Sequence, residues 1–175
     1  MCIRDSVTIT RNLIKEGRKD CFRQCVDSVR MQDYPNIEHI IVDGASTDGS
    51  IELFKELGVN YISEPDTGIY NAFNKGIKRA KGEYIAFLNS DDFFAVPEAI
   101  SRFVAAIETS DADFTSSSVN LINTDNSIKV SPVRWNFCFF GTPFCHQTMI
   151  SKTKMLRDLG SFNEKYRIFA DFDLI

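Results

Sequence analysis

The most constraining feature of this sequence is an apolar run that ends abruptly in two acids. Residues 83–88 read as a buried β-strand, and Asn89-Ser90-Asp91-Asp92 follows directly. In an open α/β sheet, ligands bind beyond the carboxyl ends of the strands, so acids at that point face a crevice. Adjacent carboxylates repel unless a proton or cation lies between them, and Mg²⁺ or Mn²⁺ prefers oxygen ligands. Asp91 is therefore a candidate metal ligand, although acids that only cap the next helix give the same pattern.

The chain on either side alternates strand-like and helix-like segments. Before the central run, expected strands lie at 7–10, 39–42 and 59–63, and expected helices at 20–32, 50–57 and 69–80. After it, the pattern predicts a helix near 100–107, a strand at 113–116, a hairpin of 119–122 with 128–130, a strand at 145–150 and a helix at 152–159. Residues 1–6 carry no strand signal. The order predicts one α/β domain whose mostly parallel, Rossmann-like sheet is flanked by helices and gains an antiparallel portion in the C-terminal part.

Composition narrows the class of protein. The chain has 175 residues and a net charge of −4, with no basic cluster of the kind that binds nucleic acid. No apolar run is long enough to span a membrane. The five cysteines include no Cys-x-x-Cys pair, which indicates a reducing compartment and predicts a cytoplasmic protein. Cys21 and Cys25 share a helix face, where we expect buried thiols.

Two common nucleotide-binding motifs are absent from the sequence. No Gly-x-Gly-x-x-Gly follows the first expected strand, and no Gly-Lys-Ser/Thr follows Gly44 or Gly49. Acids instead follow several strands and recur near the end of the chain: Asp43, Asp66, Asp91, Asp92, Asp171 and Asp173. Such acids suit a sugar nucleotide, because some can accept hydrogen bonds from the base and ribose while another holds a metal on the diphosphate.

Six motifs occur in a fixed order: VDGASTDGS at 42–50, EPDTGIY at 64–70, NKG at 74–76, GE at 82–83, FLNSDD at 87–92 and HQ at 146–147. Together they resemble the family 2 glycosyltransferases of the GT-A fold, most of all bacterial enzymes that build capsule, exopolysaccharide or lipopolysaccharide. The resemblance runs from about Val7 to the last residue. It implies an inverting glycosyltransferase of the hexosyl-transferring type.

The resemblance implies roles for individual residues. Nucleotide-sugar binding falls to Asp43, Asp66, Asn74, Asn89, Asp92 and His146. Within that set Asp43 would contact the base, Asn89 would face the ribose, and His146 would bind the diphosphate or the acceptor. Asp91 would hold Mg²⁺ or Mn²⁺. Asn89 departs from the family's Asp-x-Asp pattern, so this site offers the metal less negative charge.

The resemblance also implies a mechanism and its partners. Asp171 matches the family's catalytic base, although Ala170 stands where a Glu is often found. It would deprotonate an acceptor hydroxyl as that oxygen attacks the anomeric carbon. The donor would be a nucleoside-diphosphate sugar, most simply a UDP-sugar, and the acceptor a saccharide or lipid-linked saccharide. No nucleic acid is expected, and a C-terminal region would bring the protein to the inner face of the cell membrane.

The same resemblance predicts how the chain is divided into a donor-side and an acceptor-side half. Residues 7–118 would form the nucleotide-sugar-binding half of a single domain, and residues 119–175 an incomplete acceptor-side half. The chain stops at Ile175, where a helix is expected to begin, so we expect a C-terminally truncated fragment with little transfer activity.

A nucleotidyltransferase acting on sugar phosphates is one alternative, which the lack of glycine in residues 10–14 disfavours. A non-catalytic nucleotide-sugar-binding module is another, which Asp171 disfavours.

Overall fold

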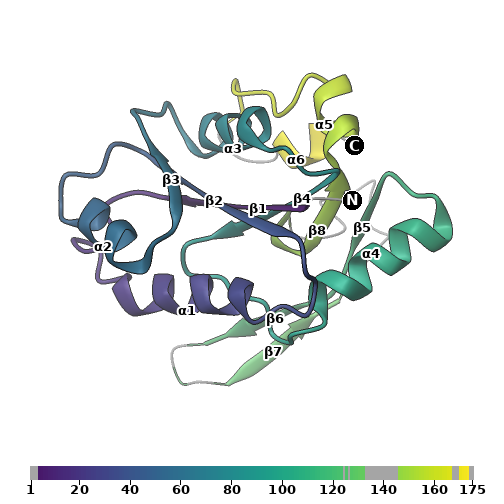
Figure 1. Ribbon diagram of the computed structural model, residues 1–175, viewed down its shortest axis with the longest axis horizontal. Coiled ribbons are helices and arrows are strands. Elements are labelled where there is room, and N and C mark those ends of the chain that lie inside the picture. Colours follow the sequence, from purple (N-terminus) through teal and green to yellow (C-terminus); the bar gives the residue numbers. More distant parts are fainter. Residues whose placement is uncertain (1–3, 124, 126, 133–145, 167–169, 174–175) are drawn as a thin grey trace.

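The computed structural model describes residues 4–123, 125, 127–132, 146–166 and 170–173, and its centre is a six-stranded sheet (Figure 1). The sheet has the order β3-β2-β1-β4-β8-β5. Its strands are β1 (Arg4–Thr10), β2 (Ile37–Asp43), β3 (Asn60–Ser63), β4 (Tyr84–Asn89), β5 (Phe114–Ser116) and β8 (Met149–Lys152). The first four are parallel, and β8 runs antiparallel to both β4 and β5. A separate hairpin pairs β6 (Val119–Ile122) with β7 (Ile128–Ser131).

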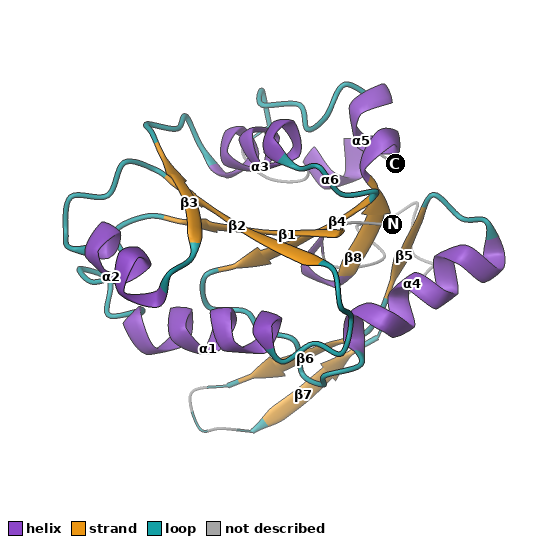
Figure 2. Ribbon diagram, in the orientation of Figure 1, coloured by secondary structure: helices purple, strands orange, loops and turns teal. Residues whose placement is uncertain are grey.

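Helices cover both faces of the sheet (Figure 2). They are α1 (Lys19–Arg30), α2 (Ser50–Leu57), α3 (Ile69–Arg79), α4 (Ala99–Ser110), α5 (Thr153–Asp158) and α6 (Ala170–Asp173). In β2, Ile40 and Val42 pack in the core cluster of α3, whereas Ile41 packs in the cluster of α1 and α2. Successive strand residues point to opposite faces, so the near-continuous apolar run of β2 is what a strand buried on both faces requires.

Helix α3 lies unusually close to the sheet. A Cβ added at Gly76 would lie 2.4 Å from Cγ1 of Val7 in β1, so only glycine permits this approach. Next to it, Phe73 meets Phe87 of β4 with ring centroids 4.7 Å apart, and Phe162 stacks on Tyr70 at 5.5 Å. These aromatic contacts attach the chain around Phe162 to α3.

The predicted α/β class, the mostly parallel sheet and the antiparallel C-terminal portion are confirmed. The prediction that residues 1–6 add nothing was wrong for residues 4–6. They join β1 because it lies between β2 and β4, and Arg4 pairs with both Ile37 and Tyr84. Backbone pairing there does not depend on the side chain.

The expected strand at 145–150 was also partly wrong. His146–Thr148 form a 3₁₀ turn, η2, and β8 begins only at Met149. The partner strand β5 ends where Ser116 pairs with Met149, so earlier residues have no ladder to join there. The aromatic stretch at 135–140 lies outside the described residues. Cys25 is buried as expected, but Cys21 is exposed.

Among the helices that the structure describes, none combines the length and the apolar character needed to cross a bilayer.

Candidate active site

The acids predicted from the sequence gather at one edge of the sheet because β1, β2 and β4 are parallel neighbours. The last residue of β2, Asp43, pairs with Thr10, and the last residue of β4, Asn89, pairs with Ile9. Neighbouring strands are about 4.8 Å apart, so these two residues are separated by roughly 10 Å across the sheet. Loops from both strands therefore border one crevice beyond the end of β1.

Asp43 is completely buried, and its carboxylate is held by three hydrogen bonds. Ser46 donates its backbone N–H to Oδ2 at 2.8 Å and its hydroxyl to Oδ1 at 2.5 Å. Ser63, at the end of β3, donates its hydroxyl to Oδ2 at 2.6 Å. The carboxylate orientation is thus fixed by the protein before any ligand arrives.

Asp66 lies directly against the backbone that follows Asp43. A Cβ added at Gly44 would lie 2.3 Å from Oδ2 of Asp66 and 3.3 Å from Cδ of Arg11. The loop that carries Asp66 is held from α3, since Lys75 donates to the Pro65 carbonyl at 2.6 Å. The structure therefore brings Asp43 and Asp66 into one site and adds Arg11, for which the sequence gave no motif signal.

The loop after β1 is tied to the loop after β2 by polar side chains of the VDGASTDGS motif. Asn12 donates its backbone N–H to Oγ of Ser46 at 2.7 Å, and Lys15 donates its own to Oδ2 of Asp48 at 2.7 Å. Leu13 does the same to Oγ of Ser50 at 3.0 Å. The motif thus joins two loops into one rigid border of the crevice.

The turn after β4 is closed by its own residues. The Asp92 backbone N–H donates to the Asn89 carbonyl at 3.1 Å, and the Asn89 N–H donates to Oδ2 of Asp92 at 3.2 Å. Ser90 is buried and accepts a bond from Nη1 of Arg18 at 3.2 Å. Asp91 lies between them and is exposed. The two adjacent acids therefore differ, because Asp92 closes the turn and Asp91 projects from it.

Arg18 is a second residue that the sequence did not reveal. Besides Ser90, it donates to the Arg11 carbonyl at 3.3 Å and pairs with Glu16. Its guanidinium, about one third exposed, thereby connects the loop after β1 to the turn after β4 and places positive charge near the acids. Only the tertiary structure could find it, because it matches no motif.

The donor set at the turn fits a hard divalent cation that arrives with its substrate. In the part of the chain that the structure describes, no three His, Cys, Asp or Glu side chains cluster as metal ligands. Mg²⁺ usually keeps several waters and uses one or two carboxylates together with substrate phosphates. The exposed carboxylate of Asp91, with Asn89 two residues earlier, meets that need, whereas an all-protein metal cage is not formed by the described residues.

Asn74, predicted to bind the nucleotide sugar, has another role in the structure. Its Nδ2 donates to the Phe162 carbonyl at 2.9 Å and to Oε1 of Glu164 at 2.9 Å, and its Oδ1 accepts the Phe162 N–H at 2.9 Å. Both halves of the amide thus hold the segment at 162–164 on α3. The structure thus shows a structural role for Asn74, whose partner Phe162 lies 88 positions away in the sequence.

Asp171 and His146 are located here by their backbones alone, since their side chains lie outside what the structure describes. His146 begins η2, and Asp171 is the second residue of α6. The Ala170 backbone N–H donates to the hydroxyl of Tyr70 at 3.1 Å. The residue before Asp171 is therefore tied to α3, whose first turn follows the Asp66 loop.

A buried polar cluster below the site provides no reactive group. Thr8 lies 2.9 Å from Nε2 of His39 and 3.6 Å from Sγ of Cys25. Burial raises the pKa of the Cys25 thiol to about 12, so it stays protonated. Burial, assisted by the charge of Arg30, lowers the pKa of His39 to about 4, so its ring stays neutral near pH 7. These residues support the sheet, and the acids remain as the groups available for chemistry.

The chain is similar to known glycosyltransferases. The model of "Glycosyl transferase family 2" matches residues 9–166. A PGL/p-HBAD biosynthesis glycosyltransferase of Mycobacterium bovis BCG is 29% identical over 161 residues, which cover 85% of this chain and 60% of that protein. An uncharacterized glycosyltransferase of Mycobacterium tuberculosis is 41% identical over 92 residues, which cover 50% of this chain and 35% of that protein.

Two solved structures share the fold. S. aureus TarS 1–349 in complex with UDP matches with a TM-score of 0.77 and 20% identity, covering 98% of this chain and 53% of that one. The mannosyltransferase PcManGT from Pyrobaculum calidifontis, in complex with GDP-Man and Mn²⁺, matches with a TM-score of 0.74 and 20% identity, covering 93% and 48%. At this identity the likeness establishes the fold alone. The chain thus spans about half to three fifths of the length of the proteins it matches end to end.

Proposed function

Since the chain belongs to glycosyl transferase family 2, we propose that it transfers a hexosyl group from a nucleoside-diphosphate sugar to an acceptor hydroxyl, with inversion at the anomeric carbon. The observation that carries this proposal is the set of acids at one sheet edge, where Asp43 and Asp66 share a site and Asp91 projects from the neighbouring turn. The nucleotides in the TarS and PcManGT structures support it by analogy.

Asp43 and Asp66 would bind the nucleoside. A carboxylate has about four lone-pair sites, so one remains on Asp43 after its three protein bonds. Because the side chain is fully buried, the base would reach that lone pair only when the loop after β2 moves. Asp66 would lie beside the base or ribose, with Asn89, Asp92 and His146 as further proposed contacts of the nucleotide sugar. We no longer propose Asn74 in this set, because its amide is used within the chain.

Asp91, with Asn89 beside it, would hold Mg²⁺ or Mn²⁺. When bound, the cation would supply positive charge that stabilises the departing diphosphate. The guanidinium of Arg18 lies on the same turn through Ser90 and would add positive charge there. Two like-charged acids next to each other in sequence are tolerated because Asp92 accepts a backbone N–H.

Asp171 would act as the general base. Its carboxylate would take the proton of the acceptor hydroxyl as the oxygen attacks from the face opposite the leaving group. A single displacement forms no covalent glycosyl-enzyme, so no second carboxylate close to the first is needed as nucleophile. The bond from Ala170 to Tyr70 would hold the base segment in place.

The biological setting belongs to the same proposal. We expect residues 7–118 to serve the donor and residues 119–175 the acceptor, a saccharide or lipid-linked saccharide in cell-envelope or extracellular polysaccharide synthesis. We expect the reaction to take place in the cytoplasm, at the inner face of the membrane. The match covers 60% of the length of the mycobacterial relative, so the activity, substrates and partners named here are all part of the proposal.

The deciding experiment identifies the products. The chain is incubated with UDP- and GDP-sugars, Mg²⁺ and saccharide acceptors, and the released nucleotide and the anomeric configuration of the product are measured by NMR. We expect nucleoside diphosphate and an inverted glycoside, with Asp171→Asn lowering transfer by roughly 10²-fold or more and leaving nucleotide binding intact. The exposed Asp173, whose Oδ2 accepts a bond from Asn163 at 3.1 Å, provides the matched Asp173→Asn control.

Other outcomes select the alternatives. Release of pyrophosphate would identify a nucleotidyltransferase. Nucleotide-sugar binding without turnover would identify a binding module. Near-parental transfer by Asp171→Asn together with loss in Asp173→Asn would move the base to Asp173.

A further inference from the structure

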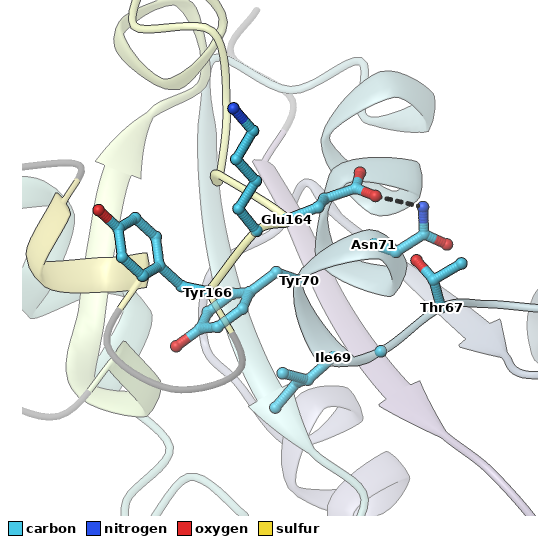
Figure 3. A pocket seen from close by; sticks show the side chains of 8 residues that line it. Thr67, Ile69, Tyr70, Asn71, Glu164 and Tyr166 are labelled. Carbon is cyan, nitrogen blue, oxygen red and sulfur yellow. Dashed lines mark hydrogen bonds between the residues drawn. The ribbon is translucent and has the colours of Figure 1, made fainter.

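A cavity of about 430 Å³ opens between the first turn of α3 and the chain at 164–166 (Figure 3). Its labelled lining residues are Thr67, Ile69, Tyr70, Asn71, Glu164 and Tyr166. We propose that this cavity is the acceptor subsite, and that it binds a pyranose ring of a saccharide. The inference rests on the proposed function and adds to it the place where a sugar ring of the acceptor binds and the residues that hold it.

The walls of the cavity match the two surfaces of a sugar ring. A pyranose has an apolar face of C–H groups and a rim of hydroxyls. In Figure 3, Tyr70 and Tyr166 lie toward one side of the cavity, and Glu164 with Asn71 lies toward the other. Tyr166 is 46% exposed, so its ring is available to cover an apolar face. The cavity volume lies in the range of small-molecule sites, which span roughly 300–1,000 Å³, and its lining combines polar and apolar groups, as a sugar ring requires.

Glu164 is fixed as a hydrogen-bond acceptor before any sugar binds. Asn74 donates to its Oε1 at 2.9 Å, and Asn71 donates to its Oε2 at 2.9 Å. Hydrogen bonds from Asn74 and then Asn71 lower the pKa of Glu164, so it is ionised at neutral pH. The carboxylate is exposed and retains lone pairs for further donors. It can therefore accept charge-assisted hydrogen bonds from sugar hydroxyls without being ordered first.

The position of the cavity favours the acceptor over the donor. Tyr70, which lines it, accepts the backbone N–H of Ala170, the residue before the proposed base Asp171. On the other side, Thr67 follows Asp66, which lies against Gly44 in the nucleotide loop. A ring in this cavity would thus lie between the nucleotide loop and the base segment, where an acceptor hydroxyl must be held for reaction.

Of the two tyrosines in the cavity wall, Tyr70 belongs to the core and Tyr166 does not complete it. The contact of this segment with the core is made by Phe162, which is buried and packs on Tyr70, Phe73 and Phe87. Tyr166 lies four residues later and leaves nearly half its surface in solvent. Truncating it therefore tests ligand binding with little effect on the fold.

The test uses simple sugars as probes. Saturation-transfer NMR is recorded on the chain with methyl α-D-glucopyranoside, methyl α-D-mannopyranoside, methyl α-D-galactopyranoside and methyl α-L-rhamnopyranoside. We expect binding of at least one of them. Tyr166→Ala and Glu164→Gln should each weaken it by about tenfold or more, the size expected for loss of a charged hydrogen bond. Tyr166→Phe, which keeps the ring, should restore binding.

Matched controls are available away from the cavity. Leu159→Ala removes another exposed apolar side chain, 56% accessible, and Glu52→Gln neutralises an exposed acid on α2. Both should bind the glycoside like the parent. Absence of binding for all four glycosides, or equal binding by the cavity variants and the parent, would overturn the proposal.

Two further arms separate the acceptor from the donor sugar and this inference from the proposed function. Adding UDP-glucose or GDP-mannose with Mg²⁺ should leave the glycoside bound, and displacement by the nucleotide sugar but not by UDP or GDP would assign the cavity to the donor sugar and overturn the proposal. Thermal shift with UDP or GDP and Mg²⁺ reports the nucleotide site independently. Nucleotide binding without any glycoside binding overturns only the acceptor subsite, whereas glycoside binding without nucleotide binding supports the subsite and contradicts sugar-nucleotide transfer.

Discussion

The loop after β2 and the turn after β4 lie at the same edge of the sheet, and each presents an acid, but the two acids are treated differently. Asp43 is fully buried and accepts three hydrogen bonds from Ser46 and Ser63. Asp91 is exposed, because the turn is closed by Asp92 and Asn89. One carboxylate is part of the protein scaffold, and the other is left open to the crevice.

This difference indicates that the two acids have different functions. A buried carboxylate that accepts three hydrogen bonds from its own chain fixes the shape of the loop around it. A carboxylate that protrudes with few protein bonds retains the lone pairs that a divalent cation needs. The comparison therefore predicts that stability depends on the β2 loop and that cation-dependent binding depends on the β4 turn.

The largest effect is expected for Asp91→Ala. Loss of a direct ligand should weaken Mn²⁺-dependent UDP or GDP binding by more than about 100-fold, because even indirect partners of a metal site contribute 10- to 100-fold. Stability should change by less than about 0.5 kcal/mol, since the side chain is exposed. Calorimetry and urea unfolding measure the two quantities, with Glu52→Ala on α2 as the exposed control. Unchanged nucleotide affinity would remove Asp91 from the metal site.

Asp43→Ala should differ from Asp91→Ala by a clear loss of stability. It leaves the N–H and hydroxyl of Ser46 and the hydroxyl of Ser63 without their acceptor in a buried site. We expect a loss of about 2–3 kcal/mol in urea unfolding, and about 1 kcal/mol for Ser63→Ala, which removes a single bond. A loss for Asp43→Ala no greater than that for Asp91→Ala would abolish the distinction between the two loops.

Acidification should also lower the stability of the protein through His39, which lies on the same strand as Asp43. Its folded pKa of about 4 lies below the ordinary value of 6.5, so the unfolded chain binds more protons between these values. The contribution of this residue to the free energy of unfolding is fully present above about pH 6.5 and is lost as the pH falls toward 4. Because residue 39 as a whole is half-buried, we expect a loss of about 1–2 kcal/mol. Urea unfolding at pH 7 and pH 4.5 should show a smaller drop for His39→Gln than for the parent; equal drops would exclude His39 as the source.

The smallest effect is expected where Asp66 meets the β2 loop. In Gly44→Ala the new Cβ would lie 2.3 Å from Oδ2 of Asp66, so that carboxylate must move. Such overpacking costs about 1 kcal/mol, so we expect the affinity for the nucleotide to fall roughly fivefold. In an Asp66→Ala background the same change should add nothing, which a double-mutant cycle measures. Additive effects would show that Asp66 does not transmit the clash.

The amino-acid sequence by itself determined which segments are strands and helices and where the acids lie along them. Hydrophobic period is a local property, so α3 and β4 could be placed within one or two residues. Asp43, Asp66 and Asp91 were predicted at one edge because each follows a strand of a parallel sheet, and chain order alone fixes that arrangement. The motif order also identified the family, which the match over residues 9–166 confirms.

Only the tertiary structure decided what those side chains contact. The sequence could not separate the buried Asp43 from the exposed Asp91, because burial depends on Ser63 in one case and on the closure of a turn in the other. It could not assign Asn74 to the segment at 162–164, or Tyr70 to Ala170, since these partners are 88 and 100 positions apart. Hydrogen bonds and packing of this kind form between surfaces that only folding brings together, and neither period nor motif encodes the distance between them.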